Sequence, residues 1–350
     1  MLHRRKSKEL KIGDVFIGGD HSVKVQSMLN VPAHDIEGNV VQAIALEKAG
    51  CQIIRVAVPD MRTIETVKAL KAAIKIPVVV DIHFNHKLAL ASIDAGADKV
   101  RINPGNIGSD ENVRLVAEKC KEFGVPIRIG VNSGSVQKEI LEKYGAPTAE
   151  ALAESAMCHV NILRKHDFDD MAISIKSSDV AVMIRAYELV AEQCDYPLHL
   201  GVTEAGTERM GLIKSSIGIG SLLTRGIGDT IRVSLTADPV KEIAAGNDIL
   251  KAVGLKNDCA SLVSCPTCGR TKINLIALAN EVEEKLAGVN KNIKVAVMGC
   301  VVNGPGEAKE ADIGIAGGNG EGLIFKKGEI LRKVPEDKIV EELMLEIEKM

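Results

Sequence analysis

The sequence predicts an α/β protein, a (β/α)8 barrel of the TIM type followed by a smaller α+β domain. Three observations lead to this fold class. The 350 residues exceed what one core usually holds, which favours two domains. The hydrophobic residues, 46% of the chain, are almost all aliphatic, as suits parallel strands that are buried on both faces. A single β/α theme also repeats along the first 250 residues.

Each repeat is a short β-branched run followed by a turn and a helical pattern. Eight such units in about 230 residues match a (β/α)8 barrel in number and length. An open doubly wound sheet is the alternative, but it usually has fewer strands and a glycine-rich phosphate motif after the first one. The eight predicted strands are VKVQSM (23–28), IIRVAV (53–58), VVVDIHF (78–84), KVRINPG (99–105), IRIGVNSG (127–134), MAISIKSS (171–178), LHLGVTEAG (198–206) and TIRVSLT (230–236).

Helical patterns connect these runs, for example at 36–50, 111–124 and 180–194, and several end at a glycine. The Gly-rich segment 211–223 resembles a phosphate-binding loop only weakly, and a helix with small residues is the other interpretation.

The repeated β/α pattern ends near residue 250. We therefore place a domain boundary there, between a barrel at 1–250 and a second domain at 251–350. The linker is expected within 251–258. The second domain is predicted to hold a helix near 273–288, a strand at 294–299 and short runs at 311–316 and 322–331. A terminal helix is expected to begin at Pro335.

The amino-acid composition excludes several classes of function. A net charge of −3 and only five Phe, three Tyr and no Trp disfavour nucleic-acid binding, which usually needs a basic field and stacking rings. No apolar stretch reaches the roughly 20 residues that span a bilayer, and the basic, polar start lacks an apolar leader segment. We therefore expect a cytoplasmic enzyme whose eight cysteines are free thiols or metal ligands.

Polar residues interrupt the predicted barrel strands near their carboxyl ends, where the active sites of such barrels lie. Five cations stand against two carboxylates, and buried charge without a partner is costly. A structural ionic layer is one interpretation; an anionic ligand such as a diphosphate, which arginine binds bidentately, is the favoured one. The residues are Arg55, Asp81, His83, Arg101, Asn103, Arg128, Asn132, Lys176, Thr203, Glu204, Arg232 and Ser234.

Three cysteines of the second domain form a candidate metal site. Cys265 and Cys268 lie in a CPTC motif, and Cys300 ends a predicted strand. With Cys259 they offer the four ligands of a structural zinc site, whereas three thiolates also suit an iron–sulfur cluster. The rigid turn NGPGEA after Cys300 presents Glu307, a hard oxygen ligand among soft sulfurs, and this favours the cluster. The zinc alternative corresponds to a nonredox phosphate-binding barrel, either a lyase or a binding module.

Several motifs together resemble the family of bacterial 4-hydroxy-3-methylbut-2-en-1-yl diphosphate synthases of the non-mevalonate isoprenoid pathway. The resemblance spans both predicted domains, and the two cysteine motifs are its most specific part. The motifs are VQSM (25–28), DIHF (81–84), RINPGN (101–106), RIGVNSGS (128–135), GVTEAG (201–206), SCPTCGRT (264–271) and MGCVVNGPGEA (298–308).

The resemblance implies a barrel that binds 2-C-methyl-D-erythritol 2,4-cyclodiphosphate and a C-terminal 4Fe-4S domain of the sulfite and nitrite reductase type. Cys265, Cys268, Cys300 and Glu307 are then the cluster ligands. The polar barrel residues, with Arg55, Arg101, Arg128 and Lys176 foremost, are then the substrate-binding positions. The implied reaction is a two-electron reductive dehydroxylation with ring opening, with flavodoxin or ferredoxin as electron donor and a homodimer whose active sites form across chains.

The resemblance also suggests roles for three barrel residues. Glu204 is the candidate acid or base beside the ligand, and Asp81 and His83 position groups or relay protons.

Overall fold

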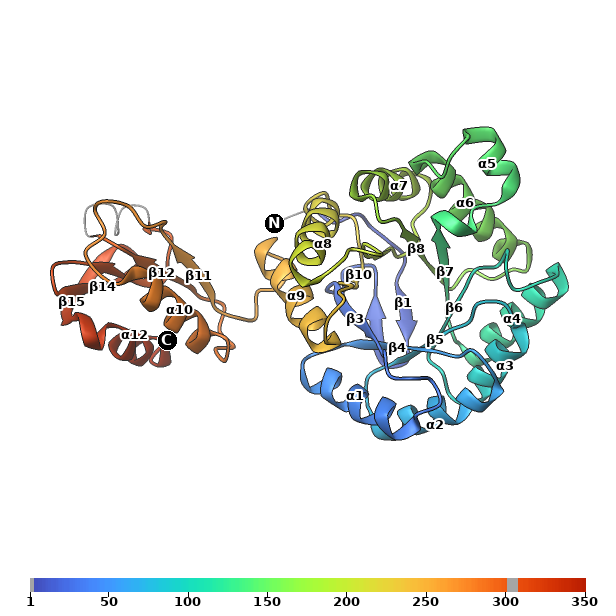
Figure 1. Cartoon of the computed structure of the whole chain (residues 1–350), viewed down its shortest axis with the longest axis horizontal. Helices are drawn as coiled ribbons and strands as arrows, with labels where there is room; N and C mark the ends of the chain where they lie inside the picture. Colours follow the sequence, from blue (N-terminus) through green and yellow to red (C-terminus); the bar gives the residue numbers. More distant parts are fainter. Residues whose placement is uncertain (1–2, 301–307) are drawn as a thin grey trace. The chain divides into compact units, whose positions relative to one another are not determined.

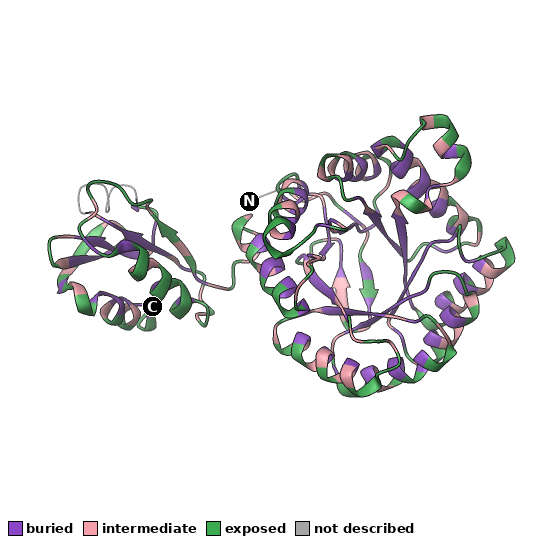
Figure 2. Ribbon diagram, viewed as in Figure 1, coloured by how far each residue is buried: buried purple, intermediate pink, exposed green. Residues whose placement is uncertain are grey.

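The computed structural model describes residues 3–300 and 308–350. The chain divides into two compact units, Met1–Leu255 and Lys256–Met350, so that the first unit ends inside the 251–258 interval. Each unit has its own hydrophobic core, shown as the purple interior of each in Figure 2.

The first unit is the predicted parallel barrel. Its eight-stranded sheet has the order β8-β7-β6-β5-β4-β3-β10-β9, and a parallel bridge from Ile173 to Leu198 joins its two ends. Figure 1 shows the helices as an outer ring around these strands. The expected fold class is confirmed, although the last two strands are shorter than their runs. The strands are β3 (Lys24–Met28), β4 (Ile53–Ala57), β5 (Val78–Asp81), β6 (Lys99–Ile102), β7 (Ile127–Asn132), β8 (Met171–Lys176), β9 (His199–Leu200) and β10 (Thr230–Ile231).

Most barrel helices begin at a side-chain cap of the kind that satisfies free backbone N–H groups. Asp35, Ser109 and Asp238 are examples. The Gly-rich segment 211–223 lies inside α8, so the helical interpretation of it is right. The helices are α1 (Ile36–Lys48), α2 (Ile64–Ala73), α3 (His86–Asp94), α4 (Asp110–Phe123), α5 (Lys138–Tyr144), α6 (Ala149–Lys165), α7 (Val180–Gln193), α8 (Glu208–Thr224) and α9 (Pro239–Ala252), with 3-10 turns η1 (Met61–Thr63) and η2 (Ser133–Ser135).

A hairpin that the sequence did not predict closes the amino end of the barrel. Strands β1 (Leu10–Ile12) and β2 (Val15–Ile17) pair antiparallel ahead of the first barrel strand. Their buried residues Leu10, Ile12 and Ile17 form one cluster with Ile53, Val79 and Ala172, which lie at the starts of β4, β5 and β8. Side chains two apart on a strand share a face, so Ile53 and Arg55 both point into the barrel.

The second unit is a mixed sheet in the order β11-β12-β13-β14-β15, in which β11, β12 and β13 are parallel and the rest antiparallel. The predicted run 322–331 is a hairpin that turns at Lys327 and Gly328, both with positive φ, as a tight two-residue turn requires. The elements are β11 (Ser261–Ser264), α10 (Leu275–Leu286), β12 (Lys294–Met298), β13 (Ile313–Gly317), β14 (Glu321–Lys326), β15 (Glu329–Pro335), η3 (Glu336–Lys338) and α12 (Ile339–Glu348).

The start of the terminal helix is corrected. Pro335 ends β15 and caps η3, and the α-helix begins only at Ile339. The strand β11 was not expected either. Among the described helices, none combines the length and the apolar character needed to cross a bilayer.

Candidate functional site

Two adjoining cavities open at the carboxyl ends of the barrel strands, where the sequence placed the site. They share Lys176 and Thr203, and ten of the twelve predicted barrel residues line one or both. The larger cavity measures about 330 Å³, and the smaller one, about 10 Å³, also reaches Ser174 and His199 inside the barrel. The larger is lined by Asp81, His83, Arg101, Asn132, Lys176, Thr203 and Glu204, and the smaller by Arg55, Lys176, Thr203, Arg232 and Ser234.

Asp81 at the end of β5 is the acidic centre of this mouth. Its Oδ1 accepts a hydrogen bond of 3.0 Å from Nη1 of Arg101, and its Oδ2 lies 3.9 Å from Nε of Arg55 and 3.7 Å from Nε2 of His83. Burial alone would raise the pKa of Asp81, but His83 and the two arginines outweigh it and hold that pKa below its ordinary value. Asp81 is therefore ionised, and its single charge is shared between two arginines.

Beneath the mouth, two cations have no hydrogen-bond partner among the described residues. Arg128 and Lys99 are fully buried, and none of the three guanidinium nitrogens of Arg128 nor Nζ of Lys99 is paired. Burial, reinforced by Arg128 and Arg55, brings the pKa of Lys99 well below its ordinary value, and burial with Arg55 does the same for Lys176. The barrel interior therefore favours anions strongly.

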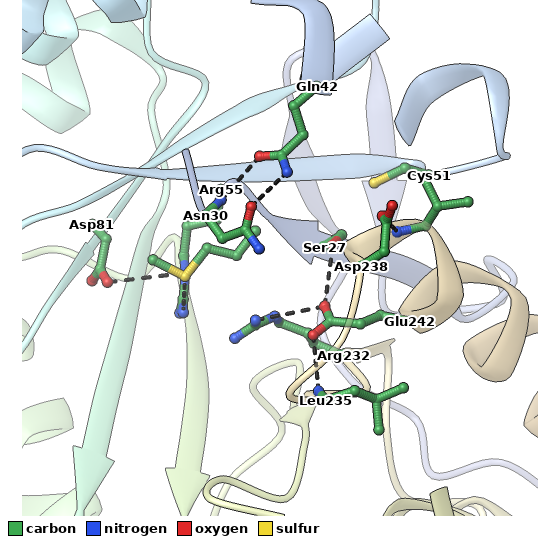
Figure 3. Close-up of polar contacts among 12 residues, drawn as sticks. Ser27, Asn30, Gln42, Cys51, Arg55, Asp81, Arg232, Leu235, Asp238 and Glu242 are labelled. Atoms are coloured by element: carbon green, nitrogen blue, oxygen red, sulfur yellow. Dashed lines mark hydrogen bonds and ion pairs between the residues drawn. The ribbon is translucent and has the colours of Figure 1, made fainter. Parts of the chain in front are cut away.

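Arg55 on β4 contacts residues at the ends of the two neighbouring strands, and Asn103 contacts a residue of its own loop. Arg55 donates to the thioether of Met28, with Nε at 3.0 Å and Nη2 at 2.6 Å, and lies beside Asp81 (Figure 3). Asn103 lines neither cavity; its Oδ1 accepts from the N–H of Gly105 at 3.1 Å and shapes the loop after β6. Arg55 thus faces the site, whereas the oxygen of Asn103 shapes a loop and its buried Nδ2 has no hydrogen-bond partner among the described residues.

Glu204 adopts a backbone conformation that L residues rarely take. Its φ is +52°, in the left-handed region, while its side chain lines the larger cavity. Such strain costs of order 1–3 kcal/mol and persists where the surrounding structure fixes it, often at functional sites. The loop after β9 therefore holds this carboxyl group in the cavity at a cost in folding free energy.

In the second unit, Cys265 and Cys300 leave neighbouring parallel strands at the same edge of the sheet. Cys265 follows β11 and Cys300 lies just beyond β12, and the N–H of Gly299 points to Sγ of Cys265 at 3.3 Å. Hydrogen bonds from Arg270 and Thr271 lower the pKa of the Cys268 thiol. Two cysteines at one sheet edge, with a third in the same CPTC motif, fit the ligand chemistry of an iron–sulfur cluster.

The described residues do not form a complete set of metal ligands. Within residues 3–300 and 308–350, no three His, Cys, Asp or Glu side chains are grouped so as to hold a metal ion, and Glu307 lies outside the described residues. The other cysteines differ in character: Cys51 and Cys120 are buried, and burial raises the pKa of Cys51 to about 11. Such thiols are protonated and suit packing.

Sequence reasoning missed Lys99, His199, Met28 and Glu242. Lys99 and His199 carried a signal, because Lys99 stands two residues before Arg101 and His199 four residues before Thr203 in the same predicted strand, and even spacing puts side chains on one face. Met28 read as an ordinary apolar residue. Glu242 lies on α9 and reads as a helix-surface acid, yet it is buried against Arg232.

Both units match the models of one protein family. Residues 7–247 match the GcpE TIM-barrel domain, and residues 261–349 match the GcpE protein C-terminal domain. Over 350 residues the chain is 56% identical to the 4-hydroxy-3-methylbut-2-en-1-yl diphosphate synthase (flavodoxin) of Halalkalibacterium halodurans, covering 100% of this chain and 95% of that protein. It is 58% identical over 347 residues to the protein of the same name from Clostridium perfringens, covering 99% of each.

Among solved structures, the barrel resembles dihydropteroate synthases. The Stenotrophomonas maltophilia protein matches with a TM-score of 0.52 and 14% identity over 70% of this chain and 97% of that one. The Burkholderia cenocepacia protein matches with a TM-score of 0.51 and 14% identity over 71% and 99%. At this identity the likeness shows the barrel fold alone.

Proposed function

The chain belongs to the GcpE family and is an oxidoreductase of that family, and from this membership we propose the reaction that its sites perform. The proposed substrate is 2-C-methyl-D-erythritol 2,4-cyclodiphosphate, and the product is 4-hydroxy-3-methylbut-2-enyl diphosphate. Two electrons and one proton enter, the ring C–O bond to phosphate breaks, and one water leaves. The freed phosphate end gains a negative charge.

One observation above all supports this proposal: the cation excess that converges on the barrel mouth. Arg55, Arg101, Lys176 and Arg232 line the two cavities, while Asp81 is the one buried acid that faces them among the described lining residues. A diphosphate supplies the missing negative charge. Because charge grows on that phosphate as the ring opens, the same cations stabilise the transition state more than the substrate. Arg128, Asn103, Asn132, Thr203 and Ser234 complete the proposed binding residues.

We assign proton handling to the larger cavity. Glu204 is the proposed acid or base beside the departing hydroxyl. His83 is exposed and lies 3.7 Å from Asp81, so it can exchange protons with solvent while Asp81 orients its ring.

In the second unit, the proposed cluster residues are Cys265, Cys268 and Cys300, with Glu307 as the fourth ligand. A bound 4Fe-4S cluster supplies electrons one at a time, from flavodoxin or ferredoxin as donor. Residues 1–250 then form the substrate-binding barrel and 251–350 the cluster domain. All eight cysteines are free of disulfides, which suits a reducing cytoplasm, the compartment we propose.

Anaerobic purification followed by cysteine substitution tests the cluster. We expect a brown protein with four iron and four acid-labile sulfide per chain, and loss of both colour and activity in Cys265→Ser, Cys268→Ser and Cys300→Ser. Cys259→Ser is the matched control and keeps both. A colourless protein with stoichiometric zinc contradicts the cluster, and bleaching by Cys259→Ser contradicts the assignment of Glu307.

Substitution in the barrel tests the substrate site. Arg55→Ala and Arg101→Ala are each expected to weaken binding of the cyclic diphosphate by about 1.5–3 kcal/mol, the value of a hydrogen bond to a charged group. The visible spectrum of the cluster is expected to stay unchanged. Wild-type kinetics in both variants would place the substrate elsewhere.

A further inference from the structure

A buried carboxylate on the last barrel helix contacts the substrate site from behind. Glu242 belongs to α9, yet its side chain is only 3% exposed. Its Oε1 accepts a hydrogen bond of 3.0 Å from the backbone N–H of Leu235, and its Oε2 accepts one of 3.2 Å from Oγ of Ser27 on β3 (Figure 3). Glu242 therefore ties the first barrel strand to the loop that follows the last one.

The same carboxylate pairs with a residue of the site. Nη2 of Arg232 lies 3.6 Å from Oε2 of Glu242, and Arg232 lines the smaller cavity together with Arg55. Figure 3 shows Arg232 between Glu242 and the side of the barrel where Arg55 lies. The charge of Arg232 also acts on Arg55, since it disfavours the charged form of that residue. Two like charges at one cavity wall need a fixed arrangement to act on one ligand.

Burial makes this carboxylate expensive. An acid that is removed from water costs several kcal/mol unless it is paired and hydrogen-bonded. Burial raises the pKa of Glu242, while Arg232, Leu235 and Ser27 oppose the rise. An amide at this position would keep most of the hydrogen bonds at lower cost, so the charge itself needs a reason.

We propose that Glu242 is a positioning residue that orients Arg232 toward the diphosphate. It holds the guanidinium by one edge and holds the backbone just after Ser234 by another contact, so that Arg232 and Ser234 reach the ligand together. The inference rests on the proposed function for the identity of the ligand, and it adds a residue that does not itself line either cavity.

A double-mutant cycle in the full-length, cluster-loaded protein tests the inference. The variants are Glu242→Gln, Arg232→Ala and the two combined. Asp248→Asn is the matched control, an acid-to-amide change at an exposed position of the same helix. The measurements are the affinity for the cyclic diphosphate by calorimetry, kcat and KM, urea unfolding, and the visible spectrum.

We expect Glu242→Gln to raise both Kd and KM about fivefold, a coupling of ordinary size for contacting residues, with kcat near that of the unsubstituted protein. In the Arg232→Ala background the same change should alter Kd less than about twofold, because the effect acts through Arg232. Equal effects in both backgrounds would overturn the proposal, as would no effect in either.

Urea unfolding tests the pairing of Glu242 with Arg232 independently of the ligand. Glu242→Gln should lower the urea midpoint of the otherwise unchanged protein, but raise it in the Arg232→Ala background, where Glu242 is a buried charge without its partner. If the unsubstituted protein fails to bind the cyclic diphosphate, the proposed function falls, and the unfolding data still decide whether Glu242 and Arg232 are coupled. If Glu242→Gln shifts the urea midpoint in the same direction in both backgrounds, Glu242 and Arg232 do not form the proposed pair.

Discussion

Single residues of this barrel are arranged for charge rather than for stability. Lys99 and Arg128 are fully buried without partners in the described structure, and Asp81 is shared by two arginines. Each unpaired buried cation lowers the free energy of unfolding. A site of this kind gains its affinity for anions at the expense of the folded state, which predicts opposite effects of one substitution on stability and on binding.

Lys99→Met tests directly whether affinity for anions and stability of the folded state oppose each other. Met fills a similar volume without charge, so we expect the free energy of unfolding to rise by about 1–3 kcal/mol at pH 7, while affinity for the cyclic diphosphate falls. Because the pKa of Lys99 is lower in the folded than in the unfolded chain, the unfolded chain binds more protons, and the penalty shrinks as pH rises toward about 10. The gain from Lys99→Met should shrink with it.

The measurement is urea unfolding between pH 7 and pH 10, with Lys75→Met, at an exposed position, as the control. A loss of stability at pH 7, or a gain that grows with pH, would show that Lys99 has a partner in solution.

Glu204→Gln separates proton transfer from binding. The amide keeps the size and part of the hydrogen bonding but cannot ionise, so kcat should fall by about 100-fold or more while KM changes little. Glu208→Gln, an exposed acid at the start of α8, is the control. Normal kcat with a raised KM would make Glu204 a binding residue.

At the scale of elements, the sequence predicted those parts that repeat a long pattern. The barrel strands were predicted because each lies in a β-branched run of at least six residues. The hairpin β1–β2 escaped, since LKI and VFI are too short to show a period. The role of Glu242 was not predicted for another reason: a helical pattern does not tell which acid is buried by tertiary packing. Lys99 could have been found from its alternation with Arg101.

The hairpin is predicted to be a structural plug and not part of the site. Ile12 is fully buried in the cluster at the amino end of the barrel, so Ile12→Ala should lower the free energy of unfolding by about 2–5 kcal/mol. Val15→Ala, at a half-buried position of the same hairpin, should cost clearly less. Substrate affinity is expected to stay near that of the unsubstituted protein, and a large loss of affinity without loss of stability would place the hairpin in the site.

At the scale of the whole molecule, the path of the chain bears on how the two sites meet. Helix α9 starts near the carboxyl ends of the strands and runs for 14 residues, about 21 Å, toward their amino ends. The eight residues 253–260 before β11 span at most about 29 Å when extended. Most of that reach would be used in returning along the barrel wall. We therefore propose a homodimer in which the cluster domain of one chain serves the barrel of the other.

Mixing two inactive variants tests this proposal. One chain carries Arg101→Ala and Arg128→Ala, which disable the barrel, and the other carries Cys300→Ser, which disables the cluster. If active sites form across chains, each heterodimer holds one working site, and heterodimers make up about half of a random mixture, so activity should recover to roughly a quarter of that of the unsubstituted protein. Each variant mixed with itself is the control. If subunit exchange is verified by tagged chains and the mixture stays inactive, the cross-chain model is ruled out.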